Sequence, residues 1–217
     1  MLEEKGRTQY ETPFLVDGEN LALSLVNTEV MTRGKRGDLL MTSQDVARWW
    51  QETCQRHPEF DEVRRESEEP IMYDTALLNA LKTLRAALRA IFNALVTGSM
   101  PEKEDVAILN AILRTGYTSL DLTEQGELAP RTHTTDPTQG LMLLPIALSA
   151  SRLISQGERK RLHHCENERC ILFFYDTTKS ATRRWCSLGC MDRARSAQRY
   201  REAKQQQAAG KRGKREL

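Results

Sequence analysis

The sequence predicts a mainly helical α+β protein made of two units, an N-terminal helical domain with a small β-hairpin and a compact C-terminal module. Three observations lead to this prediction. Leucines recur at three- and four-residue steps between residues 77 and 95, and leucines and threonines flank a Gln125-Gly126 turn. Four of the five cysteines fall in the last 53 of the 217 residues, so the C-terminal quarter has a chemistry of its own.

The N-terminal domain is predicted to cover residues 1–158. Its first regular element is an apolar stretch over residues 20–28, for which periodicity favours neither strand nor helix. Residues 32–37 hold two glycines and three basic side chains and are predicted to form a loop. A serine cap and an acid in the first turn then predict an amphipathic helix from Ser43 to Cys54, followed by a charged surface connection over residues 58–70.

Helices dominate the rest of this domain. The leucine-rich helix over residues 77–95 is predicted to end at Gly98, because glycine most easily adopts a left-handed C-cap. A second helix is predicted over residues 101–116, since it opens with a proline, which is favoured in a first turn. Two strands are predicted within residues 117–136, and residues 141–162 return to a helical pattern.

The C-terminal cysteines are spaced as Cys165-x4-Cys170 and Cys186-x3-Cys190, close to the ligand spacings of structural zinc sites. Four thiolates complete a tetrahedral zinc ion and leave no position for a catalytic water, so the pattern predicts one structural zinc. Buried or redox-active thiols are the alternative, which the spacing disfavours.

Between the two cysteine pairs, residues 171–175 and 182–186 read as a strand and a return strand joined by a turn. Ser187 then caps a helix predicted to run to about Gln207. Cys190 lies in its first turn, where the helix dipole favours the thiolate that zinc needs.

A knuckle, a hairpin and a helix N-terminus together describe a treble-clef zinc finger, here predicted over residues 159–207, with a flexible basic tail over residues 208–217. His163 and His164 precede the first cysteine and are an alternative source of a ligand. Exposed histidines with no metal role are the simpler interpretation.

Charge divides the chain near residue 158. The overall net charge of +2 hides 16 basic and 7 acidic residues from Glu158 to the end, a net +9, and 16 basic and 23 acidic residues before it, a net −7. A basic end joined to an acidic body is the electrostatic pattern of a segment that meets nucleic-acid phosphates.

Seven cations of the finger are candidates for nucleic-acid contacts. A helical step of 100° puts Arg195 and Arg199 on nearly the opposite side from the other three helix cations, so one duplex cannot touch all of them. That face also holds Asp192 and Glu202 at pairing distance, which is typical of an ordinary solvated surface. The full candidate set is Arg183, Arg184, Arg193, Arg195, Arg199, Arg201 and Lys204.

The cysteine segment resembles the CGNR zinc-finger family. The resemblance rests on the four cysteines with Phe173-Phe174-Tyr175-Asp176, Arg183-Arg184-Trp185-Cys186-Ser187 and the Cys190-x-x-Arg193 spacing. Near the other end, Leu21-Ala-Leu-Ser-Leu-Val-Asn27-Thr28 is similar to the opening of the ABATE domain that precedes this finger in the family. The resemblance implies a helical α+β domain that senses a ligand or stress, fused to a DNA-binding finger of a transcription regulator.

The motif that names the family is altered in this chain. Cys190-Met191-Asp192-Arg193 stands where Cys-Gly-Asn-Arg is usual, and an acidic Asp192 would repel a phosphate. Ser24 stands where an acid is common in the ABATE opening. The thiols are intact, so we expect the metal site to survive these changes.

The sequence therefore predicts a cytoplasmic DNA-binding transcription regulator with one zinc ion. It predicts no enzyme, because no glycine-rich phosphate loop, nucleophile elbow or zincin motif occurs. Its apolar runs are too short for a membrane span, and the N-terminus lacks the apolar segment of a secretory signal.

Several alternatives stay open at this stage. The finger could bind a protein, or the basic helix and tail could bind RNA, and a small-molecule effector and a homodimer also remain open. Four aromatic residues either line a ligand pocket or belong to the core, the commoner place for aromatics at helical positions: Trp49, Trp50, Tyr73 and Phe92.

Overall fold

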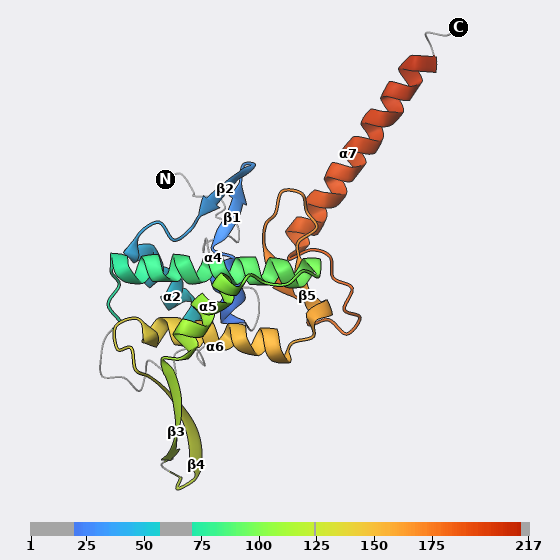
Figure 1. Cartoon of the computed structure of the whole chain (residues 1–217). Helices are drawn as coiled ribbons and strands as arrows, with labels where there is room; N and C mark the ends of the chain where they lie inside the picture. Colours follow the sequence, from blue (N-terminus) through green and yellow to red (C-terminus); the bar gives the residue numbers. More distant parts are fainter. Residues whose placement is uncertain (1–19, 57–70, 124, 214–217) are drawn as a thin grey trace, which may run out of the picture.

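The computed structural model describes residues 20–56, 71–123 and 125–213, with side chains up to Gln206. The connection predicted over residues 58–70 lies outside these ranges. Within them the protein is a mainly helical α+β chain, as predicted, in which antiparallel two-stranded sheets alternate with helices along the sequence (Figure 1).

A bundle of helices forms the N-terminal body. Helix α4 (Thr75–Thr97) is its centre and contacts α1 (Leu21–Val26), α2 (Ser43–Arg56) and α5 (Lys103–Leu113). Helix α6 (Gly140–Gln156) closes the bundle against α1 and α5. We call this bundle the helical body.

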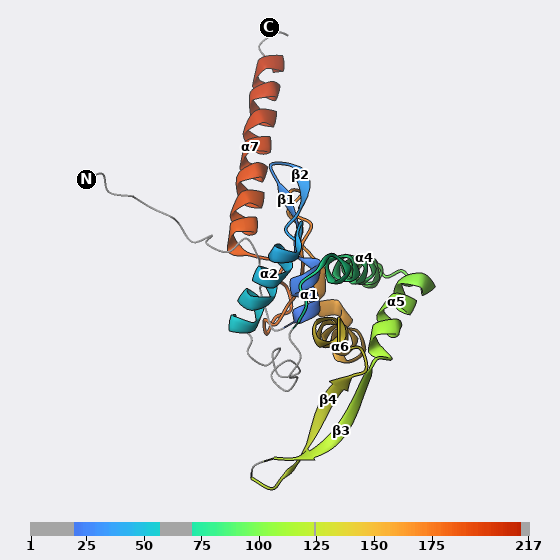
Figure 2. The same ribbon diagram turned by 90° about the vertical axis from the view of Figure 1, so that its left-hand side faces the viewer.

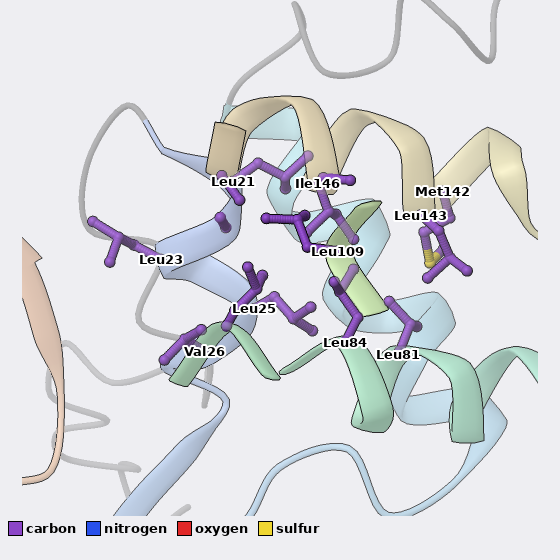
Figure 3. Close-up of a cluster of buried hydrophobic side chains, with 14 of the residues drawn as sticks. Leu21, Leu23, Leu25, Val26, Leu81, Leu84, Leu109, Met142, Leu143 and Ile146 are labelled. Atoms are coloured by element: carbon purple, nitrogen blue, oxygen red, sulfur yellow. The ribbon is translucent and has the colours of Figure 1, made fainter. Parts of the chain in front are cut away.

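Apolar side chains of these helices meet in one core (Figure 3). The helical repeat directs Leu81 and Leu84 of α4 towards Leu25 of α1 and Ile146 of α6, and none of the four is exposed. Burying a leucine side chain contributes about 2 kcal/mol, so this core supplies the main driving force for folding.

The signals at the helix ends act as the sequence predicts. Gly98 ends α4 in the left-handed conformation with φ of 81°, and the Asp74 carboxylate accepts a hydrogen bond of 2.8 Å from Leu77 N at its start. The ambiguous stretch after Asn20 is a helix, capped by the Asn20 side chain and buried on every side.

A hairpin stands where the sequence predicts a loop. Strands β1 (Glu29–Thr32) and β2 (Lys35–Asp38) pair in antiparallel register around Arg33 and Gly34. Both tip residues have positive φ, 52° and 78°, as in the two-residue turns that match the twist of paired strands. An arginine at the first tip position hides this turn from sequence analysis, which looks there for Asn, Asp or Gly.

The second hairpin is confirmed. Strands β3 (Gly116–Leu122) and β4 (Leu128–Thr134) pair along their whole length around the predicted turn and extend away from the helical body (Figure 1). Helix α6, by contrast, is shorter than predicted, because the chain leaves it at Gly157 for a 3-10 turn, η2 (Arg159–Arg161).

The strand pairing of the finger differs from the prediction. Strand β6 (Phe173–Tyr175) pairs with β5 (Leu162–His164), and not with residues 182–186. The carboxylate of Asp176, which is fully buried, accepts a hydrogen bond of 2.8 Å from Arg183 N. That backbone donor is therefore satisfied by a side chain, and the predicted return strand does not form.

The chain ends in a long helix that leaves the rest of the molecule. Helix α7 (Leu188–Gly213) is six residues longer than its predicted end near Gln207, so the predicted tail over residues 208–217 is helical as far as it is described. At about 1.5 Å per residue the 26 residues span about 39 Å. Both views show α7 projecting from the body (Figures 1 and 2).

Candidate metal centre and its basic helix

The first cysteine pair lies on a tight turn that follows β5. Cys165 N donates to Leu172 O at 2.9 Å, and Cys170 N donates to Asn167 O at 2.8 Å. These two hydrogen bonds fold the chain back on itself, so that the two thiols face the same point. We call residues 165–172 the knuckle.

The second pair is set by the start of α7, as predicted. The Ser187 hydroxyl accepts a hydrogen bond of 3.2 Å from Cys190 N, and Met191 N donates to Ser187 O at 3.1 Å. Ser187 thus caps the helix and holds Cys190 in its first turn, at the positive end of the helix dipole.

The four thiols form a compact cluster, in which Cys170 is half-buried and the other three are buried. All four Sγ atoms lie within 4.8 Å of one another, with 3.7 Å between Cys170 and Cys186 and 3.5 Å between Cys186 and Cys190. Sulfurs about 2.3 Å from a tetrahedral zinc ion would lie about 3.8 Å apart, so the arrangement suits one zinc ion. Among the residues that the structure describes, this is the one group of three or more His, Cys, Asp or Glu side chains arranged to hold a metal ion.

Hydrogen bonds between the thiols separate their pKa values. A hydrogen bond from Cys170 lowers the pKa of Cys165 to about 2, and the same interaction raises the pKa of Cys170 to about 12. The cluster alone therefore favours a thiolate beside thiols. A divalent cation lets all four cysteines become thiolates, because it replaces the shared protons as the positive partner.

Polar groups around the cluster hold the sulfurs in place. Cys186 N donates to Cys165 Sγ at 3.5 Å, and the Arg193 guanidinium donates to Cys190 Sγ at 3.1 Å. The side chain of Asn167, only 5% exposed, donates to Cys190 O at 3.1 Å and ties the knuckle to α7. Such outer contacts orient ligands and offset the negative charge of thiolates.

Sequence analysis did not single out Asn167. Its signal is its place two residues after the first cysteine, where an asparagine can bond to the local backbone and close a turn. The two histidines are half-buried rather than exposed. The His163 and His164 rings pack against Phe174 and Phe173, and neither belongs to the thiol cluster.

The finger is joined to the helical body by buried contacts. The Asn27 side chain, at the end of α1, donates to Phe173 O at 2.8 Å and accepts from Phe173 N at 2.9 Å. Arg89 of α4 donates to Ile171 O in the knuckle and to Val26 O of α1, both at 2.9 Å. Two side chains of the finger strands, Leu162 and Phe173, belong to the core of the body.

Three of the seven candidate cations are engaged inside the finger. Arg183 donates to the carbonyl groups of Trp185 and Cys186 and lies over the Phe174 ring, 4.9 Å from its centroid. Arg193 bonds to the cluster sulfur described above. Arg184 is exposed but pairs with Glu166 at 2.5 Å.

The remaining candidates lie on α7 and differ in their partners. Arg201 pairs with Glu168 of the knuckle at 2.7 Å. Arg195, Arg199 and Lys204 are exposed and make no ion pair with any residue that the structure describes. The acids expected to pair with the first two do not do so, and Glu202 instead accepts a hydrogen bond from Gln198. The three helix cations without an ion pair among the described residues therefore lie on both sides of α7, with Arg195 and Arg199 on one side and Lys204 on the other.

Two hollows flank the finger. A groove of about 630 Å³ separates the knuckle from α7 and is lined by Arg193, Tyr200 and Arg201, among others. A pocket of about 400 Å³ lies between α1, α6 and β6. The four aromatic residues singled out in the sequence line neither hollow but belong to the core or pack against it: Trp49, Trp50, Tyr73 and Phe92. The indole of Trp49 donates to the Ser24 hydroxyl at 3.3 Å.

Comparison with protein families agrees with this arrangement. Residues 19–157 match the ABATE family, described as "Putative stress-induced transcription regulator", and residues 161–203 match the CGNR zinc finger. A comparison with curated proteins gives no significant match. No helix in the described ranges has the length and apolar character required to cross a membrane. The chain belongs to the ABATE family and carries a C-terminal CGNR zinc finger.

Proposed function

We propose that this chain is a DNA-binding transcription regulator in which one structural zinc ion holds the finger and α7 carries the contacts to duplex DNA. The family to which the chain belongs is one of transcription regulators, which implies nucleic-acid binding. The observation that carries the proposal is the pair Arg195 and Arg199, exposed on a projecting helix and without an ion pair among the described residues.

The zinc is proposed to be structural, since four thiolates leave no coordination position for a substrate or water. When bound, it supplies cross-linking between the knuckle and the start of α7. The residues that would hold it are Cys165, Cys170, Cys186 and Cys190. Four reduced cysteines also suit a reducing compartment such as the cytoplasm, where we propose that the protein acts.

Helix geometry selects the DNA-facing side of α7. Arg193 and Arg201 line the groove towards the knuckle, and each already has a partner there. At 100° per residue, Arg195 and Arg199 lie one turn apart on the opposite side of the helix. A phosphate can approach that side without breaking an existing pair, so we propose it as the contact face.

The proposal is tested by fluorescence anisotropy of the zinc-loaded chain with random duplex DNA over a salt series. Each phosphate contact contributes about 0.9 to the slope of log Kd against log salt. The variant R195Q/R199Q should therefore lower the slope by about 2. The matched control is K103Q/R114Q, which removes two exposed cations from the ends of α5, on another part of the body.

Three outcomes would count against the proposal. Equal slopes of log Kd against log salt for R195Q/R199Q and the control would show that these arginines of α7 do not contact the DNA. No binding by the wild-type chain at low salt would favour the second candidate, a protein-binding finger. The groove beside α7 supports that candidate, because Tyr200 lines it and is 71% exposed. Stronger competition by RNA than by DNA for the bound protein would show that RNA is the preferred partner.

A further inference from the structure

The tip of the β1–β2 hairpin is a second cluster of free positive charge, outside the finger. Arg33, Lys35 and Arg36 are all exposed there, and none makes an ion pair with a described residue. The cluster stands out because the part of the chain before residue 158 carries a net charge of −7. We call these three residues the hairpin tip.

The hairpin rises on the same side of the helical body as α7. Both views show this arrangement, with the hairpin beside the first turns of the long helix (Figures 1 and 2). Contacts agree with it, because Val30 of β1 packs against the buried cluster that contains Cys165, Cys186 and Cys190. The finger therefore holds one face of the hairpin.

The strand register shows which tip residue lies on that face. Val30 pairs with Gly37 and Thr32 pairs with Lys35, and side chains alternate along a strand. Lys35 thus lies on the face of the hairpin that meets the finger, two residues further out than the contact made by Val30. Arg36 lies on the opposite face.

The base of the hairpin is fastened to the helical body and to the knuckle. Arg89 Nε pairs with Glu29 at 2.8 Å, and Arg85, only 4% exposed, pairs with Asp38 at 2.6 Å. The same Arg89 donates to Ile171 O of the knuckle. The hairpin and the finger are consequently positioned by one side chain, which leaves little freedom for the tip to move away from α7.

The hairpin tip and α7 carry cations on two elements that project in the same direction, and such an arrangement suits a stiff, regularly charged polymer such as duplex DNA. Duplex DNA presents a phosphate about every 1.7 Å along its axis, so a protein that touches it at one element can reach further phosphates with the next. Because the base of the hairpin is held by buried ion pairs, binding at the tip costs mainly the entropy of its side chains. We propose that the hairpin tip is a second DNA contact, which binds the phosphate backbone beside the segment held by α7.

This inference rests on the proposed DNA binding and deepens it by adding a contact from the ABATE domain. The test uses the zinc-loaded full chain, random duplex DNA and the same salt series. We expect R33Q/K35Q to lower the slope of log Kd against log salt by about 2, whereas K103Q/R114Q, with the same loss of charge, leaves it unchanged. Zinc content and circular dichroism of each variant check that the exposed substitutions leave the fold intact.

Single variants sharpen the test. K35Q, on the finger-facing side, should lower the slope by about 1, and R36Q by less. If R195Q/R199Q weakens binding and R33Q/K35Q behaves like K103Q/R114Q, the inference is overturned while the proposed function stands. If the wild-type chain binds no DNA, both fail. If the hairpin variant changes binding to RNA and not to DNA, the partner is RNA and the inference is overturned.

Discussion

Replacement of Asn27 by alanine tests whether the finger and the helical body fold as one unit. The Asn27 side chain is 4% exposed and bonds to both backbone groups of Phe173, 146 residues away in the chain, at 2.8 and 2.9 Å. In N27A the Phe173 N–H and C=O lose these partners. Phe173 is itself 2% exposed, so water does not replace the asparagine without disturbing the core.

The expected loss follows from these two groups. A buried backbone donor or acceptor left without a partner costs about 1–3 kcal/mol, so two of them give about 2–6 kcal/mol. A domain of this kind has a total free energy of unfolding of about 5–15 kcal/mol. N27A should therefore remove a large share of the stability although it deletes only one small side chain.

The assay is urea unfolding of the full chain at a fixed concentration of free zinc, because zinc binding itself raises stability. N79A is the control, since Asn79 is exposed on α4 and its change should stay within about 0.5 kcal/mol. Hydrogen exchange should show the largest loss of protection in β5 and β6. A loss for N27A no larger than for N79A would refute the reasoning.

Three further predictions concern the metal centre and the buried ion pairs. In C186S, elemental analysis should show that the zinc is lost. The melting temperature of the helical body should also fall, because Leu162 and Phe173 of the finger belong to the core of the body, and an unchanged melting temperature would contradict this. R193Q should weaken zinc retention against a chelator by about tenfold, while R195Q leaves it unchanged. Equal zinc retention by the two variants would show that the contact between Arg193 and Cys190 does not support metal binding. Burial raises the pKa of Asp38, but hydrogen bonds from Arg85 and Leu40 outweigh it and hold this pKa below its ordinary value of 3.8. The stabilisation from the Asp38 carboxylate is therefore present above about pH 4 and is lost as the pH falls through the folded pKa. D38N should flatten the dependence of the urea midpoint on pH below about 5, and parallel curves for D38N and wild type would contradict this.

Short-range patterns predicted the helical body well. Leucine spacing and a terminating glycine define α4, and a turn flanked by alternating residues defines the β3–β4 hairpin, because each of these signals acts over a few residues. The cysteine spacing likewise predicted the thiol cluster, since two short loops and a helix start confine where the sulfurs lie.

Long-range pairings were not predictable in the same way. Strand β6 pairs with β5 while the Asp176 carboxylate accepts the hydrogen bond from Arg183 N, and periodicity reveals neither of these contacts. Which cations are free depends on ion pairs formed across the knuckle, such as that between Glu168 and Arg201, 33 residues apart. Sequence analysis therefore could not distinguish Arg201, which is paired, from Arg195, Arg199 and Lys204, which make no ion pair with a described residue.

Contacts of α1 and α4 join the helical body to the finger and to the β1–β2 hairpin. Asn27 at the end of α1 fixes β6, and Arg89 of α4 contacts the knuckle, α1 and the start of the β1–β2 hairpin at once. The direction of α7 is set by the knuckle, and that of the hairpin by α4. A change in the packing of α1 on α4 would therefore be transmitted to the finger and the hairpin together, which gives an event in the ABATE domain a route to the proposed DNA contacts.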